Sequence, residues 1–258
     1  MSSVLRSIYL GLLQFRPTRR TARLVRARIQ RIAGYTDPFL DLAGICKQSK
    51  AELFLDIGCH NGETLERFLE SGIDCPVTAF DPIAANIQAT RNRIPNSNRV
   101  SLVQAALSDT DGTASFFVNK NEQTSSLLDN DRGNTQSFFE ECKHVERIDV
   151  TTLRLDTWIS SQSKSFKSIV VKCDTQGAEG KVVRGGLMTL RESVSAFYCE
   201  VMIGKMYQGQ LGFDQLNEFL ETDCGLLLKN IYPCLHDSCG RAVQFDALWV
   251  KPAFLRAG

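Results

Sequence analysis

The sequence lacks several features that would place it in a specialised class of protein. No apolar run approaches the roughly 18–20 residues that a membrane-spanning helix needs, and the longest run near the start is Ile8–Leu13. No repeat of fixed period is visible, which argues against solenoids and propellers. Hydrophobic residues make up 43% and charged residues 23% of the 258 residues, which excludes bulk disorder. The length suits one α/β domain with a tail.

Acidic residues are missing from residues 1–34, which we call the basic arm. The arm contains eight arginines: Arg6, Arg16, Arg19, Arg20, Arg23, Arg26, Arg28 and Arg31. The rest of the chain then holds 22 basic and 29 acidic residues, a net charge of −7. This acidic body, residues 35–258, would repel a phosphate backbone, so no nucleic-acid partner is expected.

The basic arm also places Leu5, Ile8 and Leu12 at helical spacing. Three interpretations of this basic amphipathic pattern stay open. The arm could lie on an anionic membrane surface, pack on the body as a helix with solvated arginines, or act as a transit peptide.

The nine cysteines form no disulfide framework. Cys173 and Cys199 lie inside apolar runs, which indicates buried thiols in a reducing compartment. With no clear cleavable signal peptide, we expect a cytoplasmic protein, peripheral at most to the inner face of a membrane. Cys234, His236 and Cys239 do not have the spacing of a common zinc site, so no metal is expected.

From Ala51 onward, short apolar runs alternate with helical patterns. The predicted strands are Leu53–Ile57, Val77–Phe80, Val100–Gln104, Ile169–Cys173, Phe197–Val201, Leu226–Ile231 and Ala247–Val250. The predicted helices are Glu63–Glu70, Ala84–Arg93, Ala178–Arg191 and Phe213–Thr222. Strands separated by such helices predict an α/β fold, with a doubly wound, mostly parallel sheet of seven strands. In such sheets ligands bind at the carboxyl ends of the strands.

A β-rich insertion interrupts this alternation. Thr113–Val118 and Arg147–Thr152 could form an extra ribbon. Between them, residues 119–146 are polar, with a weak helical pattern near Phe138–Cys142. A segment of this length with little regular pattern is often a lid or a substrate loop, although a disordered surface loop is an equal alternative.

A glycine turn follows the first predicted strand, in the run Asp56-Ile57-Gly58-Cys59-His60-Asn61-Gly62. Such a turn lets a ligand approach the backbone closely. The third glycine of a dinucleotide fingerprint is missing. Asp56 adds negative charge, which favours a ligand with a cationic amino acid end over one with phosphates. An ordinary tight turn between a strand and a helix is the alternative.

Acidic residues follow the other predicted strands as well. Asp81, at the tip of the second strand, is placed to accept the hydroxyls of a ribose, or else to cap the next helix. The third strand is followed by Gln104-Ala105-Ala106-Leu107-Ser108-Asp109, which would lie beside a base. Lys172, Asp174 and Glu179 surround the fourth tip, and Glu200 ends the fifth strand. We expect these side chains at the mouth of one cleft.

In combination, these motifs resemble those of the class I S-adenosylmethionine-dependent methyltransferases with a Rossmann-like fold, and within that class the FkbM family. The resemblance covers about Ala51 to Pro252. It rests on eight markers in order: LFLDIGCHNGET, TAFDP, AALSD with Gly112, TLRLDTW, VVKCDTQGAE, Arg184-Gly185-Gly186, CEV and FDALWVKP. The chain departs from the family at Cys59, His60 and Asn61, and Gln176 stands where glutamate is also common.

The resemblance implies a cofactor site and a reaction. Asp56, Gly58, Cys59 and Gly62 would hold the methionine end of S-adenosyl-L-methionine, and Asp81 its ribose. Ala105, Ala106, Ser108 and Asp109 would flank the adenine. The family typically methylates a hydroxyl oxygen of a sugar, glycan, polyketide or similar small molecule, which would be the partner of this chain.

An alcohol is a poor nucleophile until its proton can leave, so such a reaction needs a positioned general base. Asp174 is the first candidate for this base, with Glu179, Glu200 and His144 as alternatives and Lys172 tuning its neighbours. A structural ion-pair and capping network around Gly177 is the competing interpretation of Asp174 and Glu179.

Two other functions remain open at this point. A nicotinamide (NAD)-dependent oxidoreductase has a similar sheet, although the missing third glycine argues against it. A non-catalytic protein could keep the cofactor pocket, or act as a membrane-associated adaptor through the basic arm.

Overall fold

The structure, a computed structural model, describes residues 36–95, 97–131, 143–237 and 239–255. The basic arm and the weak helical pattern near Phe138–Cys142 lie outside these ranges. Among the residues that are described, no helix combines the length and the apolar character needed to cross a membrane.

The described body is built on a sheet with five parallel strands in the order β3-β2-β1-β7-β8. These strands are β1 (Leu53–Ile57), β2 (Val77–Phe80), β3 (Val100–Val103), β7 (Ile169–Cys173) and β8 (Val194–Met202). Every residue of β1, β2 and β7 is buried. Helices cover both faces of these strands, which is why β1, β2 and β7 are mostly apolar instead of alternating.

The remaining strands complete the edge of the sheet beyond β8. There β11 (Ala242–Val250) runs antiparallel to β8, and both β9 (Leu227–Ile231) and β10 (Leu235–His236) pair with β11. The sheet therefore has eight strands instead of the seven predicted, because the two-residue strand β10 shares the outer edge with β9.

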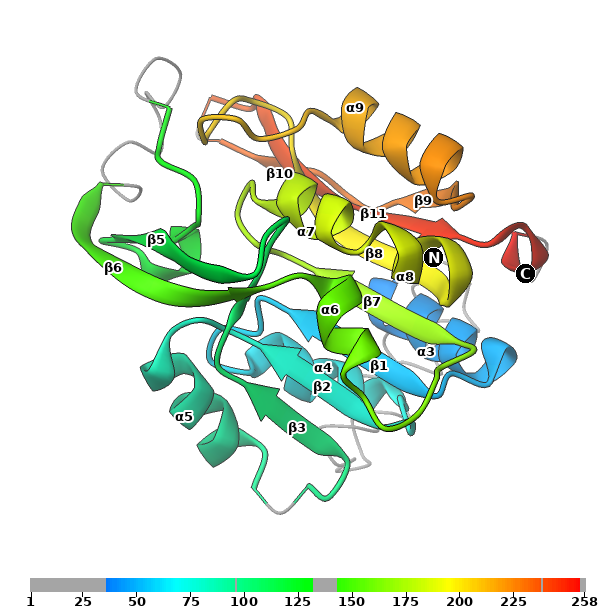
Figure 1. The fold of residues 1–258 in the computed structure, drawn as a ribbon. Helices are drawn as coiled ribbons and strands as arrows, with labels where there is room; N and C mark the ends of the chain where they lie inside the picture. Colours follow the sequence, from blue (N-terminus) through cyan, green and yellow to red (C-terminus); the bar gives the residue numbers. More distant parts are fainter. Residues whose placement is uncertain (1–35, 96, 132–142, 238, 256–258) are drawn as a thin grey trace, which may run out of the picture.

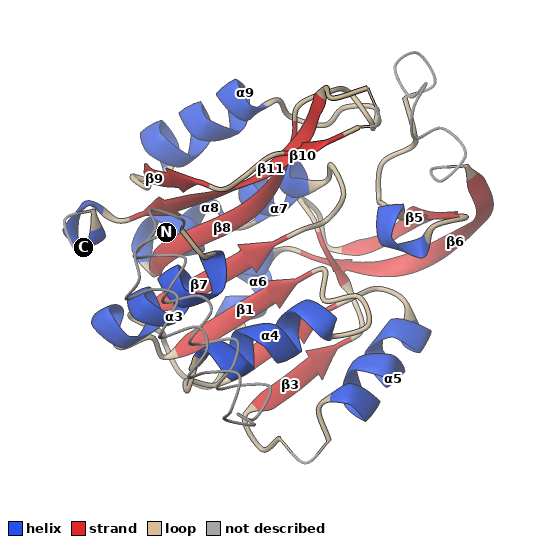
Figure 2. Ribbon diagram, turned by 180° about the vertical axis from the view of Figure 1, so that it is seen from behind, coloured by secondary structure: helices blue, strands red, loops and turns tan. Residues whose placement is uncertain are grey.

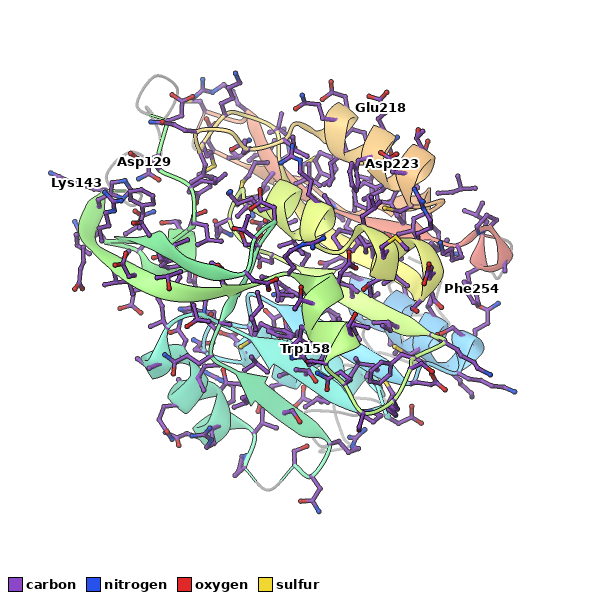
Figure 3. The ribbon with its side chains drawn as sticks, in the orientation of Figure 1. Asp129, Lys143, Trp158, Glu218, Asp223 and Phe254 are labelled. Atoms are coloured by element: carbon purple, nitrogen blue, oxygen red, sulfur yellow. The ribbon has the colours of Figure 1, made fainter. Side chains whose placement is uncertain are left out.

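Helices cover both faces of the sheet (Figures 1 and 2). A hydrophobic core lies on each face. One face carries α3 (Pro38–Ser49), α4 (Glu63–Ser71) and α5 (Ala84–Arg93). The other face carries α6 (Leu155–Ser160), α7 (Glu179–Gly185), α8 (Leu187–Glu192) and α9 (Phe213–Glu218). On this second face Trp158 of α6 packs edge-to-face against Phe80, with ring centroids 5.0 Å apart (Figure 3).

Two predicted helices differ from the structure. The predicted helix Ala178–Arg191 is divided into α7 and α8 at Gly186. A Cβ atom on Gly185 would lie 1.9 Å from the carbonyl oxygen of Ser108, so the end of α7 packs directly on the backbone there. The predicted helix Phe213–Thr222 is α9 followed by a π-helical turn, Phe219–Asp223.

The insertion forms a separate three-stranded sheet in the order β4-β6-β5. Its antiparallel ribbon consists of β5 (Gly112–Asn119) and β6 (His144–Leu153), and β4 (Ala106–Leu107) pairs with β6 in parallel. In Figure 2 the arrowheads of β1, β3 and β7 point toward the side on which this ribbon lies. Two 3₁₀ turns, Glu122–Thr124 and Pro252–Phe254, complete the described elements.

Candidate active site

A cavity of about 380 Å³ lies at the carboxyl ends of the parallel strands. Its lining comes from the glycine turn, the carboxyl ends of β2, β7 and β8, the segment after β3, helix α5, strand β11 and the insertion, and includes Gly58, Cys59, His60, Asp81, Asn86, Ala105, Ala106, Phe116, Thr124, Leu127, Lys172, Asp174, Gln176, Glu200 and Gln244. Several residues selected from the sequence therefore line one cavity together with the β-rich insertion, among them Asp81, Lys172, Asp174 and Glu200.

The glycine turn is shaped by close backbone packing. Gly58 has a φ of 77°, and a Cβ atom there would lie 1.9 Å from the carbonyl oxygen of Asp174. Gly62 has a φ of 79°, and its Cβ atom would lie 2.8 Å from Thr90. Only glycine fits both conditions. Gly58 lines the cavity, whereas Gly62 begins α4 outside the lining.

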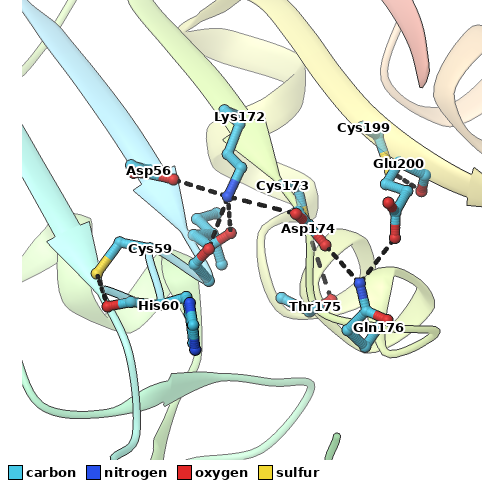
Figure 4. Close-up of polar contacts among 12 residues, drawn as sticks. Asp56, Cys59, His60, Lys172, Cys173, Asp174, Thr175, Gln176, Cys199 and Glu200 are labelled. Atoms are coloured by element: carbon cyan, nitrogen blue, oxygen red, sulfur yellow. Dashed lines mark hydrogen bonds and ion pairs between the residues drawn. The ribbon is translucent and has the colours of Figure 1, made fainter. Parts of the chain in front are cut away.

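Asp56 and Lys172 form a buried ion pair behind the cavity (Figure 4). The Lys172 ammonium lies 2.9 Å from Asp56 Oδ1 and donates to the Gly58 carbonyl oxygen at 2.6 Å. Burial alone would lower the pKa of Lys172, but the charges of Asp56 and Asp174 raise it above its usual value. Burial raises the pKa of Asp56, and Lys172 opposes that rise. Asp56 is fully buried and outside the lining, so it acts on the cavity through Lys172.

Asp81 connects the tip of β2 to the glycine turn. Its Oδ2 accepts from the backbone N–H of His60 at 3.0 Å, and its Oδ1 accepts from Ile83 and from the Asn86 amide. Burial raises the pKa of Asp81, and these hydrogen bonds oppose the rise. The carboxylate lines the cavity, and two oxygens with several lone pairs leave acceptor capacity for a ligand hydroxyl.

The segment after β3 contributes apolar residues to the cavity, including Leu107. Ala105 and Ala106 also line the cavity, together with Phe116 and Leu127 from the insertion. Ser108 and Asp109 lie outside the lining, where Ser108 donates to Asp109 and Asp109 forms an ion pair with Lys181 at 3.3 Å. This part of the cavity is an apolar slot that suits a flat ring.

A pair of carboxylates faces the other part of the cavity. Asp174 follows β7 and Glu200 belongs to β8, and both line the cavity. The side-chain amide of Gln176 lies between them, donating to Asp174 Oδ1 at 2.9 Å and to Glu200 Oε2 at 2.8 Å (Figure 4). The amide of Gln244 donates to the other oxygen of Glu200. Burial, followed by the charges of Asp174 and Asp246, raises the pKa of Glu200 well above its usual range.

Two other acidic or basic candidates do not line this cavity. Glu179 is buried at the start of α7, where its Oε1 accepts from the backbone N–H and the hydroxyl of Thr175 at 2.7 and 2.9 Å. Burial raises the pKa of Glu179 to about 7. His144 lies in β6 and contacts Asn119 and Asp129, and Figure 3 shows Asp129 at the outer end of the ribbon. The side chains of Glu179 and His144 therefore contact other residues of the fold and do not line the cavity.

Metal-ligand geometry does not occur in the described part of the chain: no group of three or more histidine, cysteine, aspartate or glutamate side chains could hold an ion there. Cys59 lines the cavity, and burial raises the pKa of its thiol. Cys224 is buried, whereas Cys234 and Cys239 are exposed.

The contacts of some lining residues could not be predicted from the sequence. Gln176 and Gln244 are amides whose importance depends on the carboxylates that they contact across strands. The register that pairs Glu200 with Asp246 brings Gln244 beside Glu200, and composition does not reveal that register. The polar insertion did suggest a lid or substrate loop, and its residues 121–125 line the cavity.

The match to one family model, which covers more than half of the chain, shows its family. The model of the methyltransferase FkbM domain matches residues 56–228, more than half of the chain. A relative, the 2-O-methyltransferase NoeI of Sinorhizobium fredii, is 29% identical over 176 residues, covering 66% of this chain and 71% of the relative. Among solved structures, the chain is similar to a TehB-like SAM-dependent methyltransferase from Corynebacterium glutamicum, with 14% identity, a TM-score of 0.40 and coverage of 90% and 97%. It is also similar to the precorrin-6y C5,15-methyltransferase of Geobacter metallireducens, with 8% identity, a TM-score of 0.41 and coverage of 78% and 80%.

Proposed function

This chain belongs to the FkbM methyltransferase family, and from that premise we propose that it transfers a methyl group from S-adenosyl-L-methionine to a hydroxyl oxygen of a sugar, glycan or similar small molecule. The single observation that carries the proposal is the shared cavity. The glycine turn, Asp81 and the carboxylates of Asp174 and Glu200 all line this cavity.

The residues of this chain fit the cofactor on chemical grounds. The glycine turn comes so close to the end of β7 that a Cβ atom on Gly58 could not be accommodated. Asp81 offers a carboxylate to ribose hydroxyls, and the slot at Ala105 and Ala106 suits an adenine ring. When bound, this cofactor supplies an electrophilic methyl group on a sulfonium.

The tasks left to the protein are alignment, exclusion of water and removal of one proton. We assign proton removal to the pair of carboxylates, Asp174 and Glu200, because both line the cavity and the Gln176 amide donates to both of them. Glu179 is assigned a structural role at the start of α7, since its oxygen is already occupied by Thr175. Lys172 forms an ion pair with Asp174, with 3.8 Å between its Nζ and Asp174 Oδ2.

The acceptor class is supported by the relative. NoeI is named a 2-O-methyltransferase, which is an enzyme that methylates a hydroxyl. The polar wall of the cavity, formed by Asn121, Gln123 and Thr124 of the insertion, offers hydrogen bonds to a hydroxylated acceptor.

The first test is calorimetry of S-adenosylhomocysteine binding to the wild-type protein and to Asp81→Asn. The substitution keeps the shape of the side chain but removes the charge that ribose hydroxyls would use. We expect an increase in Kd of roughly ten- to a hundredfold, the range for a lost hydrogen bond to a charged group. Asp149→Asn, on an exposed part of β6, is the matched control and should leave Kd unchanged.

The second step measures transfer of radioactive methyl groups to a panel of methyl glycosides of common hexoses and 6-deoxyhexoses. Transfer to at least one of them, abolished by Asp174→Asn or Glu200→Gln with cofactor binding retained, supports the proposal. Binding of NAD without binding of S-adenosylhomocysteine would favour the oxidoreductase. Cofactor binding with no transfer to any hydroxyl would favour a non-catalytic protein.

We also propose a place in the cell for this reaction. The charge pattern of the basic arm suits contact with the anionic inner face of a membrane, while the acidic body remains in the cytoplasm. A lipid-linked or surface glycan would then be within reach of the cavity.

A further inference from the structure

Gln176 makes an unusual pair of contacts at the cavity. Both hydrogens of an amide NH₂ group are available as donors, and here they serve two carboxylates on neighbouring strands. One goes to Asp174 at 2.9 Å and the other to Glu200 at 2.8 Å (Figure 4). The amide therefore separates two acids that would otherwise face each other directly.

The opposite end of the same amide is fixed by Tyr207. The Tyr207 hydroxyl lies 3.1 Å from Gln176 Oε1 and 2.8 Å from the carbonyl oxygen of Thr124, and its proton serves these two acceptors. The side chain of Tyr207 is almost fully buried, and its backbone N–H donates to Gln210 at 2.9 Å. A donor at Oε1 leaves the amide with one favourable orientation, in which the NH₂ end faces the carboxylates.

The backbone of Gln176 supports the same interpretation. Its φ of 55° lies in the left-handed region, which is unfavourable for a non-glycine residue. Strained residues of this kind gather at functional sites, where the surrounding structure holds them in place. Glycine would relieve the strain but would have no amide.

We propose that Gln176 is a positioning residue of the reaction centre: its amide, oriented by Tyr207, fixes the carboxylates of Asp174 and Glu200 on either side of it in the cavity. This inference rests on the proposed function for its catalytic meaning. It goes further by assigning a role to an amide through the two acids that it contacts. It also connects the insertion to the acids, because Tyr207 contacts Thr124 as well.

The sequence gives this inference a specific consequence. Glutamate is also common at position 176 in the family that this chain resembles, so Gln176→Glu is the natural comparison. In this chain the change would bring a third carboxylate between two others. A donor to an ionised carboxylate favours its charged form, and a neighbouring negative charge opposes it.

The test is a pH titration of the carboxyl carbons by ¹³C NMR, on full-length protein labelled at aspartate and glutamate and saturated with S-adenosylhomocysteine. The Glu200 signal is identified by its loss in Glu200→Gln. We expect the midpoint of Glu200 to move upward by about one pH unit in Gln176→Leu, and further in Gln176→Glu. Tyr207→Phe should move it in the same direction by a smaller amount, because the amide remains but can rotate.

Gln176→Gly guards against a folding defect, since glycine adopts the left-handed backbone freely. It should shift the Glu200 midpoint as Gln176→Leu does. Gln88→Leu, at an exposed position of α5, is the matched control and should leave the Glu200 midpoint unchanged. An unchanged midpoint in a folded Gln176→Gly protein would overturn the proposal, even if the variant had lost stability.

Coupling between the two residues is the second readout. If Tyr207 acts through the amide, Tyr207→Phe should shift the midpoint in the wild-type background but not in Gln176→Leu. Equal shifts in both backgrounds would contradict the assigned role of Tyr207. With a methyl glycoside that the wild type methylates, Gln176→Leu should lower kcat at least tenfold and leave the acceptor KM within twofold. If no glycoside is methylated, the proposed function fails while the titration still decides the role of Gln176.

Discussion

Lys172 interacts with three acidic side chains. It forms an ion pair with Asp56, lies 3.8 Å from Asp174 and contributes to the electrostatics of Glu200. Desolvation makes such a buried pair a weak source of net stability, but removing one partner leaves an uncompensated charge. The ion pair between Lys172 and Asp56 therefore affects stability most when one partner is removed and the charge of the other remains buried.

Replacing Lys172 by methionine tests this point. Lys172→Met should lower the free energy of unfolding by about 3–5 kcal/mol, because Asp56 then stays buried without its partner. Urea denaturation at neutral pH measures the loss. The double variant with Asp56→Asn removes the orphaned charge and should recover a clear part of that stability. A double variant no more stable than Lys172→Met would show that the lysine acts mainly through its packing.

At the scale of single residues, the sequence located the edge of the sheet but not the lining of the cavity. Asp56, Asp81, Asp174 and Glu200 were expected at strand tips, and the structure places all four at that edge. Whether each side chain faces the cavity depends on partners from distant segments. Asp56 is turned toward Lys172 across the register of β1 and β7, and sequence spacing contains no such information.

Helix α7 begins at a buried carboxyl group. Glu179 accepts two hydrogen bonds from Thr175, yet burial and the charge of Asp174 raise its pKa to about 7. The folded protein therefore holds this proton more tightly than the unfolded chain, where the pKa is near the ordinary value of 4.5. The associated stability is fully present below pH 4.5 and is lost as the pH rises toward 7.

Glu179→Gln isolates this contribution, because the amide oxygen can still accept from Thr175. We expect the variant to match the wild type in Tm near pH 4.5 and to become the more stable protein as the pH rises to 7.5. The difference should approach about 3 kcal/mol, from the shift in pKa. Thermal denaturation of both proteins across this pH range measures it. A constant difference in Tm would contradict a raised pKa at Glu179.

The parallel strands were the most predictable elements. The bounds of β1, β2 and β7 agree with the predicted runs, because strands buried on both faces are continuously apolar. Helices α3 and α6 were not predicted. Helix α6 has only six residues, which is too short for a helical period to emerge, and tertiary contacts decide its conformation. The division at Gly186 likewise follows from packing against Leu155 and Ser108.

The whole molecule separates charge along the chain. The basic arm has eight arginines and no acid, whereas the body has a net charge of −7 and a cavity lined by carboxylates. The sequence alone indicates this asymmetry, since net charge needs no fold. With these opposite charges, an anionic surface would attract the basic arm and repel the acidic body.

Deleting residues 1–34 tests whether the arm has that role. Full-length protein should sediment with vesicles that contain anionic lipid, because each arginine near such a surface contributes about 1 kcal/mol. Binding should fall as salt is raised from about 0.05 to 0.5 M, since the Debye length shrinks over that range. The deletion variant should remain in the supernatant, and zwitterionic vesicles should bind neither protein.

A variant with the eight arginines changed to glutamine keeps the apolar pattern and separates charge from hydrophobic insertion. The described lining of the cavity comes from residues 57–244, so the deletion should leave the Kd for S-adenosylhomocysteine unchanged. Equal sedimentation of the deleted and intact proteins would exclude the arm as the membrane contact.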